Sequence, residues 1–201
     1  MCARTGFCLP DAKAGYKIGY DLAVAALITV VFYYLVVRLP DYQRRRRLKR
    51  SLETHYKAFR QDCIEIMLLA ANGGCLAEEP EALLEQDKFR AYFNEEVAPG
   101  RKRFHNFLNN LDEDHLLQLL TNMEIFREEL VFVLNNTDIP KDEPFEFLKG
   151  LSAAIYSLKD VTLGYDETKP LERFLWDVFA WYNLITGYRK RDIVKDMIEA
   201  I

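Results

Sequence analysis

The chain has 201 residues, half of them hydrophobic, and a formal net charge of -4. Residues 1–50 hold ten Lys/Arg and three Asp/Glu, a balance of +7, which leaves 17 basic and 28 acidic side chains, or -11, in residues 51–201. This acidic body argues against a general nucleic-acid binder, whose surface has to be positive to meet phosphates. The length predicts one core plus an appendage.

An apolar run lies close to the N-terminus. Leu22–Val37 contains sixteen residues without a charge, and an extension back to Ile18 gives about the length that crosses a ~30 Å hydrocarbon core. No face of the run is hydrophilic, whereas a surface helix of a soluble protein has such a face. We therefore expect a transmembrane helix over 18–38, the alternative being a short segment buried in a globular core. Four tyrosines flank it at positions that favour the membrane interface: Tyr16, Tyr20, Tyr33 and Tyr34.

A basic neck over 39–51 follows the apolar run. With the preceding arginine it forms a membrane-surface basic cluster: Arg38, Arg44, Arg45, Arg46, Arg47, Lys49 and Arg50. A cleaved signal peptide has its positive charge before the apolar run, so this order indicates a permanent signal anchor. The cluster either recruits anionic lipid headgroups or only determines the topology.

The charge order also predicts the topology. Because positive charge stays on the cytoplasmic side, we expect residues 1–17 to be a short extracytoplasmic tail and 52–201 to be a cytoplasmic domain, in a bacterial inner membrane. Cys2 and Cys8 in the tail either form a disulfide, if their compartment is oxidising, or are two unpaired thiols. Asp21 either caps free N–H groups near the start of the helix or is an intramembrane carboxylate.

The first helix of the body carries one apolar stripe. Pro40 should break or kink the chain before it, because proline cannot donate to the preceding turn. Apolar residues then recur at steps of three and four and predict a helix that ends near Asn72. The stripe packs against its own domain or forms a coiled-coil seam between protomers. Its members are Leu52, Tyr56, Phe59, Cys63, Ile66 and Ala70.

The rest of the chain has helical periodicity and no alternating β pattern of useful length. We expect helices over 79–97, 104–111, 112–134, 144–163, 170–186 and 189–200, and therefore an all-α fold: one N-terminal transmembrane helix followed by a multi-helix cytoplasmic bundle. Leu171–Ile185 is apolar nearly all round, which indicates the central helix of the bundle or, alternatively, a contact with a partner or a membrane.

Motifs that carry chemistry are scarce. The chain has no Gly-rich phosphate loop and no paired C-x-x-C, so we expect no cofactor. Asp112 and His115 are spaced to share one metal ion, but an N-terminal cap is the expected role of Asp112, and we expect no metal.

One short stretch matches an enzyme motif. Arg50-Ser51-Leu52-Glu53-Thr54-His55 fits the Arg-x4-His pattern and so resembles the HEPN family of small all-helical ribonucleases. The resemblance implies that Arg50 and His55 are a catalytic pair that polarises the RNA phosphate and moves a proton, usually across a dimer interface. It covers six residues, and Ser51 stands where the family often has Asn, His or Asp.

The sequence thus favours a single-pass, membrane-anchored interaction, scaffold or regulatory module that is not an enzyme. The expected partners are anionic lipid at the neck and a protein partner or a second copy of the chain; nucleic acid is not expected. Two alternatives stay open: a membrane-tethered HEPN-like ribonuclease and an accessory subunit of a membrane transport complex, in which Asp21 would be essential.

Overall fold

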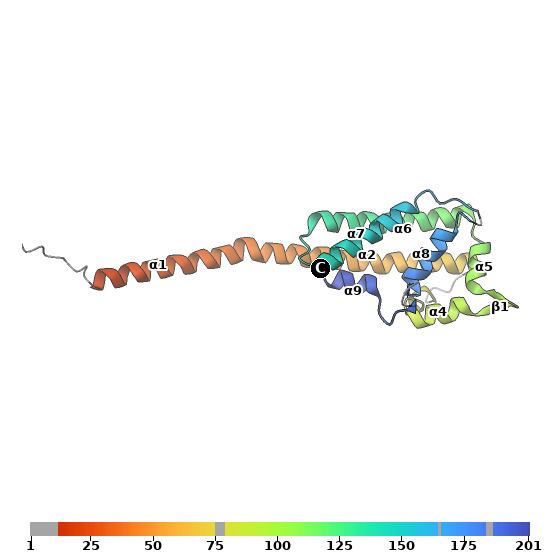
Figure 1. Ribbon diagram of the computed structural model, residues 1–201, viewed down its shortest axis with the longest axis horizontal. Helices are drawn as coiled ribbons and strands as arrows, with labels where there is room; N and C mark the ends of the chain where they lie inside the picture. Colours follow the sequence, from red (N-terminus) through yellow and green to blue (C-terminus); the bar gives the residue numbers. More distant parts are fainter. Residues whose placement is uncertain (1–11, 75–78, 165, 184–186) are drawn as a thin grey trace, which may run out of the picture. The chain divides into compact units, whose positions relative to one another are not determined.

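The computed structural model describes residues 12–74, 79–164, 166–183 and 187–201 (Figure 1). The chain divides into two compact units, Met1–Arg46 and Arg47–Ile201. The question of a bond between Cys2 and Cys8 lies outside the described residues. The described part is mostly helical, which confirms the expected all-α class.

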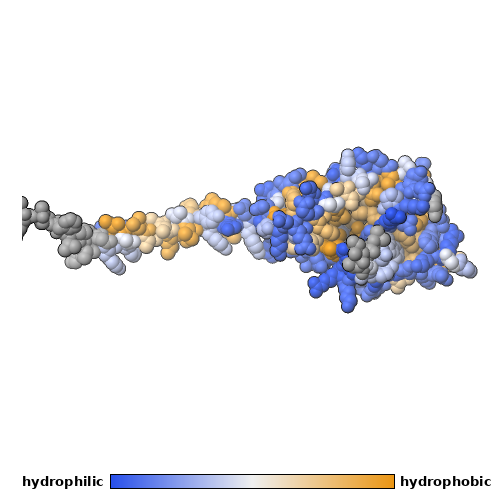
Figure 2. Space-filling view, in the orientation of Figure 1, coloured by the Kyte–Doolittle hydropathy of each residue, from blue (hydrophilic) through white to orange (hydrophobic). Residues whose placement is uncertain are grey.

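The described part of the first unit, from residue 12 onward, is helical. Helix α1 (Ala12–Tyr33) runs into a π-helical turn, η1 (Tyr34–Arg38), and then into α2 (Leu39–Asn72). The large apolar side chains of α1 and η1 are exposed, and Figure 2 shows them as a hydrophobic stretch. The Thr29 hydroxyl donates to the Ala25 carbonyl at 2.8 Å, so this hydroxyl has a partner inside its own helix. Among the described residues, one helix is therefore long and apolar enough to cross a membrane.

Pro40 does not break this helix, contrary to one of the expected outcomes. The helix is continuous from Tyr16 to Asn72 over 57 residues. Pro40 has no N–H to donate, and its ring would clash with a carbonyl of the preceding turn. The wider π-helical turn just before it, in which the Leu39 N–H donates to the Tyr34 carbonyl, accommodates the proline.

The second unit is a helical bundle with two short hairpins. After α2 its helices are α3 (Glu79–Ala82), α4 (Gln86–Asn94), α5 (Arg103–Asn109), α6 (Glu113–Asn136), α7 (Asp142–Ser157), α8 (Lys169–Phe179) and α9 (Ile193–Glu199). In the described residues, strands occur only as the antiparallel pairs β1 (Glu96–Ala98) with β2 (Arg101–Lys102) and β3 (Tyr182–Asn183) with β4 (Gly187–Tyr188).

Helix α2 supplies much of the bundle core. All six members of its predicted stripe are buried, so the stripe packs inside its own domain. The Phe59 ring stacks on Phe126 of α6 with 4.8 Å between ring centroids. The same ring lies 5.8 Å from that of Phe179 of α8. Helices α6 and α8 therefore pack on α2 through aromatic side chains.

Several predicted helices are shorter than expected, and two of them are followed by hairpins. The segment 79–97 contains α3, a turn and α4, and its last residues enter the first hairpin, which turns at Gly100 with φ 71°. The apolar run Leu171–Ile185 is not one central helix, because α8 ends at Phe179 and the chain then forms the second hairpin. Trp181, just after the helix, has φ 51°, which is strained for a bulky residue.

Buried and exposed leucines of α6 provide a matched test of the core. Leu119 is fully buried, whereas Leu117 is 65% exposed. We expect Leu119→Ala to lower the free energy of unfolding by about 2–5 kcal/mol, because it removes apolar contacts and leaves a cavity. Leu117→Ala should change it by less than about 0.5 kcal/mol. Urea unfolding of the full chain in detergent, followed by tryptophan fluorescence, measures both; equal effects would contradict the assigned faces of α6.

Candidate functional site

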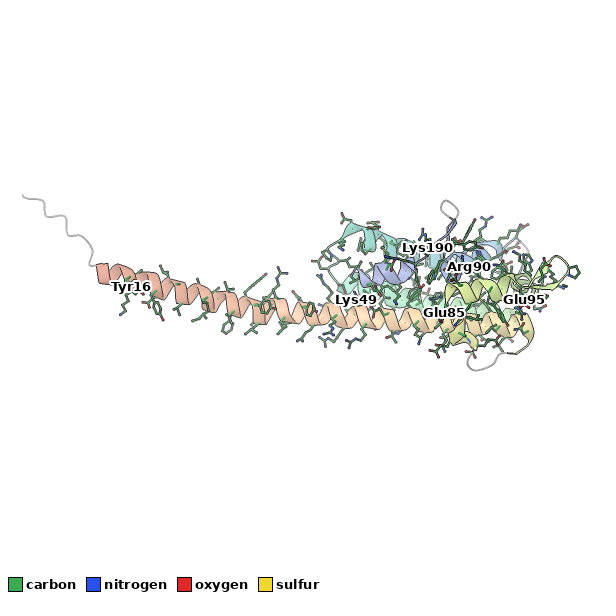
Figure 3. All side chains as sticks on the ribbon, turned by 90° about the horizontal axis from the view of Figure 1, so that it is seen from below. Tyr16, Lys49, Glu85, Arg90, Glu95 and Lys190 are labelled. Carbon is green, nitrogen blue, oxygen red and sulfur yellow. The ribbon has the colours of Figure 1, made fainter. Side chains whose placement is uncertain are left out.

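The four tyrosines predicted for the membrane interface all lie on exposed positions of α1 and η1. Tyr16 and Tyr34 are 18 positions apart in the helix, which is about 27 Å at 1.5 Å per residue and close to the thickness of a hydrocarbon core. Tyr16 extends away from the helix (Figure 3). Asp21 lies well inside α1, which begins at Ala12, so it does not cap the start of that helix.

The residues of the basic cluster surround the helix. Arg44–Arg47 occupy four consecutive positions of α2, and steps of 100° place them on every side of it. Lys49 differs from the other residues of the cluster because it contacts the bundle: its Nζ donates to the Glu199 carbonyl at the end of α9. The cluster is therefore partly engaged by the bundle itself.

The structure places the two residues of the ribonuclease-like motif on different sides of α2. Arg50 and His55 are five positions apart, or about 140° around the helix. The His55 Nδ1 lies 2.9 Å from the Ser51 carbonyl oxygen and 3.8 Å from Oε1 of Glu129 on α6. Arg50 is exposed. Arg50 and His55 therefore start from different sides of α2 within one copy of the chain.

A polar cluster lies in the bundle core, formed by Tyr56 and Arg60 of α2, Gln86 of α4, and Asp192. Arg60 Nη1 pairs with Asp192 Oδ2 at 3.1 Å, and both side chains are less than 10% exposed. Arg60 Nη2 also donates to the Leu84 carbonyl at 2.6 Å. This ion pair joins α2 to the start of α9 across 132 positions of sequence.

Tyr56 and the cap of α9 complete the contacts of the Asp192 carboxylate. The Tyr56 hydroxyl donates to Oδ1 and Oδ2 at 2.9 and 3.0 Å. Burial, and then the negative charge of Asp192, raise the pKa of Tyr56 well above its usual value, so the hydroxyl keeps the proton that it donates. The Lys195 N–H donates to Oδ1 at 3.1 Å, which makes Asp192 the N-cap of α9.

Gln86 holds the second hairpin at both ends. Its Nε2 donates to the carbonyls of Ala180 and Arg189, each at 2.9 Å. These bonds span the strained Trp181, whose ring lies 6.0 Å from the Arg60 guanidinium. Gln86 therefore ties the hairpin to α4, and the Arg60–Asp192 pair ties the start of α9 to α2.

A cleft of about 430 Å³ opens beside α8. Its aromatic walls include Phe104 and Trp176, whose ring centroids are 4.8 Å apart. Two carboxylates and two cations also line it, namely Glu172, Asp177, Lys102 and Arg173. Because the charges balance, the lining selects neither an anionic nor a cationic ligand.

Three large apolar side chains of α6 are exposed on its outer side. Leu117, Ile125 and Phe132 are 65%, 53% and 51% exposed, and Thr121 and Glu128 lie between them around the helix. A groove of about 350 Å³ between α6 and α7 adjoins them, with Ile125 and Ile155 in its wall. Among the described residues, nothing covers these three side chains.

Asp112 has the predicted capping role. Its Oδ1 accepts from the His115 N–H at 2.8 Å, and this bond lowers the pKa of the carboxyl. In the part of the chain that the structure describes, no three His, Cys, Asp or Glu side chains lie together as a metal ion would require.

No protein-family model, curated protein or solved structure matches this chain.

The sequence analysis did not identify the polar cluster, although two features of the sequence point to its members. Arg60 lies four residues after Tyr56, on the buried side of α2, where a cation requires a partner. Asp192 precedes an apolar helical segment, as N-cap residues do. That these two residues pair with each other follows only from the fold.

The ion pair of the polar cluster can be tested against an exposed one. Asp192→Asn keeps a capping side chain but leaves the buried Arg60 without its counter-charge, so we expect a loss of about 3–5 kcal/mol in the free energy of unfolding. The control is Glu81→Gln, which removes an exposed pair with Lys57 at 3.2 Å and should cost less than about 1 kcal/mol. Urea unfolding of the full chain in detergent compares them; a small effect of Asp192→Asn would show that the pair does not stabilise the bundle.

Proposed function

We propose that this chain is a single-pass membrane protein whose cytoplasmic bundle binds a protein partner at the membrane surface. The observation that carries the proposal is the continuous helix Tyr16–Asn72. Its first part exposes apolar side chains on every face, and its last part is the core helix of the bundle. One helix thus belongs to both the proposed anchor and the proposed binding module.

A lipid bilayer explains the apolar exposure of α1 and η1. In hydrocarbon every backbone polar group needs a partner, and a helix provides these partners within itself. Side chains such as Leu27 and Val30 are 64% and 66% exposed. In water, each exposed side chain of this kind would cost roughly 1.5–3 kcal/mol relative to full burial.

The direction of insertion follows from the basic cluster. Its cations come after the apolar helix, so we place the N-terminus outside and the bundle in the cytoplasm, with a bacterial inner membrane as the proposed setting. Each cation close to an anionic surface contributes about 1 kcal/mol, and Arg44–Arg47 therefore keep the start of the bundle near the headgroups.

The acidic composition of the bundle supports a protein partner of opposite charge. Residues 51–201 have 28 acidic and 17 basic side chains, a balance of -11. Such a surface steers a basic protein towards it and repels anionic lipid and RNA. Tethering at the membrane raises the effective concentration of the bundle for a partner in the same membrane.

Recovery of a partner tests this function. We expect affinity purification of the full chain from gently solubilised native membranes to bring one protein in a stable ratio, identified by mass spectrometry. A control chain, in which 18–38 is replaced by an unrelated membrane-spanning helix, should recover the same protein because the bundle makes the contact.

Other outcomes would favour the alternative functions. Loss of the partner from the control chain would indicate contacts inside the membrane, as in a transport subunit. RNA decay that depends on the chain and is lost in His55→Ala would indicate a ribonuclease. Recovery of no specific protein would contradict the proposed function.

A further inference from the structure

We infer that the cleft beside α8 is a binding site for a small zwitterion with an aromatic body, the chemistry of a free aromatic amino acid. The inference goes beyond the proposed function, because the chain can bind such a molecule without a protein partner. The cleft holds about 430 Å³, which is within the usual range for small-molecule sites.

Aromatic rings from three parts of the bundle line the cleft. Phe104 of α5 and Trp176 of α8 have ring centroids 4.8 Å apart. Tyr182 and Tyr188 of the second hairpin have ring centroids 5.2 Å apart. Helices α5 and α8 and the hairpin thus place flat apolar surfaces around one space. An aromatic ring of a ligand fits these walls, because offset or edge-to-face contacts between aromatic rings are favourable.

Two carboxylates of α8 border the same cleft. The side chains of Glu172 and Asp177 form no hydrogen bond and no ion pair within 4 Å with any described residue. Burial raises the pKa of Asp177, although the positive charges of Arg173 and Arg189 act in the opposite direction. An ammonium group of a ligand has three N–H donors, and it can therefore bind these carboxylates through charge-assisted hydrogen bonds.

The cations of the cleft come from two elements. Arg173 of α8 forms no ion pair within 4 Å with any described residue. Lys102 of β2 is held by Asn94, because its Nζ donates to the Asn94 Oδ1 at 2.9 Å. That bond uses one of the three N–H donors of the ammonium group, and the other two remain for a carboxylate of a ligand.

The balance of charges in the lining favours a molecule that carries both signs. An anion would meet like charge at Glu172 and Asp177, and a cation would meet like charge at Lys102 and Arg173. A zwitterion instead places its ammonium group beside a carboxylate and its own carboxylate beside a cation. The lining therefore distinguishes a free amino acid from the corresponding amine or acid alone.

A series of ligands with the same aromatic ring tests the inference. Isothermal titration calorimetry of the full chain in detergent measures the binding of L-phenylalanine, the cation phenethylamine, the anion hydrocinnamate and the neutral N-acetyl-phenylalanine amide. We expect L-phenylalanine to bind about tenfold or more tightly than each of the others, because each of them lacks at least one charge-assisted contact. Equal binding of any of the three, or no binding of L-phenylalanine up to about 10 mM, would overturn the inference.

Matched variants locate the site. Glu172→Gln removes a carboxylate of the cleft and Lys102→Met removes a cation, and we expect each to weaken the binding of L-phenylalanine by about tenfold. Glu81→Gln and Lys57→Met remove the same charges from an exposed ion pair that does not line the cleft, and they should leave binding unchanged. Equal thermal melting of the four variants and the wild type controls for folding. Unchanged binding in either cleft variant would contradict the assigned site.

The two proposals fail independently. If the purified chain does not bind the zwitterion, the inference about the cleft is wrong, and the recovery of a protein partner still tests the proposed function. If native membranes yield no partner, the proposed function fails, and calorimetry still decides whether the cleft binds an amino acid.

Discussion

The helix from Tyr16 to Asn72 has to suit two surroundings with one backbone. Up to Val37 its side chains are apolar on every face, whereas from Leu52 onward they are apolar on the side that packs in the bundle. The helix can continue between these parts because the π-helical turn before Pro40 accommodates a residue that cannot donate. The proposed anchor and the core of the bundle consequently share one continuous helix.

That shared helix also organises the end of the chain. Arg60 on α2 binds Asp192, and Asp192 in turn caps α9. Gln86 binds both ends of the hairpin that precedes α9. A buried ion pair adds little net stability compared with apolar packing, but removal of one partner is costly. The Arg60–Asp192 pair therefore holds the start of α9 against α2, and Gln86 holds the hairpin against α4.

The sequence was sufficient for features that depend on local periodicity. It predicted the apolar helix, the α2 stripe and the cap at Asp112. It did not predict that α8 ends at Phe179, because the apolar run continues to Ile185 and only contacts distant in sequence hold the hairpin. Helical periodicity also separates the exposed Leu117 from the buried Leu119 of α6.

The central claim is that the apolar helix lies in a lipid bilayer, and alkaline carbonate extraction of native membranes tests it most directly. The full chain should stay in the membrane pellet. A reference chain with Leu27→Asp and Val31→Asp should move to the soluble fraction, because each charge in the middle of a span costs about 2.5–3.5 kcal/mol. Release of the wild-type chain into the soluble fraction would contradict the account, since protein rather than lipid would then cover Tyr16–Val37.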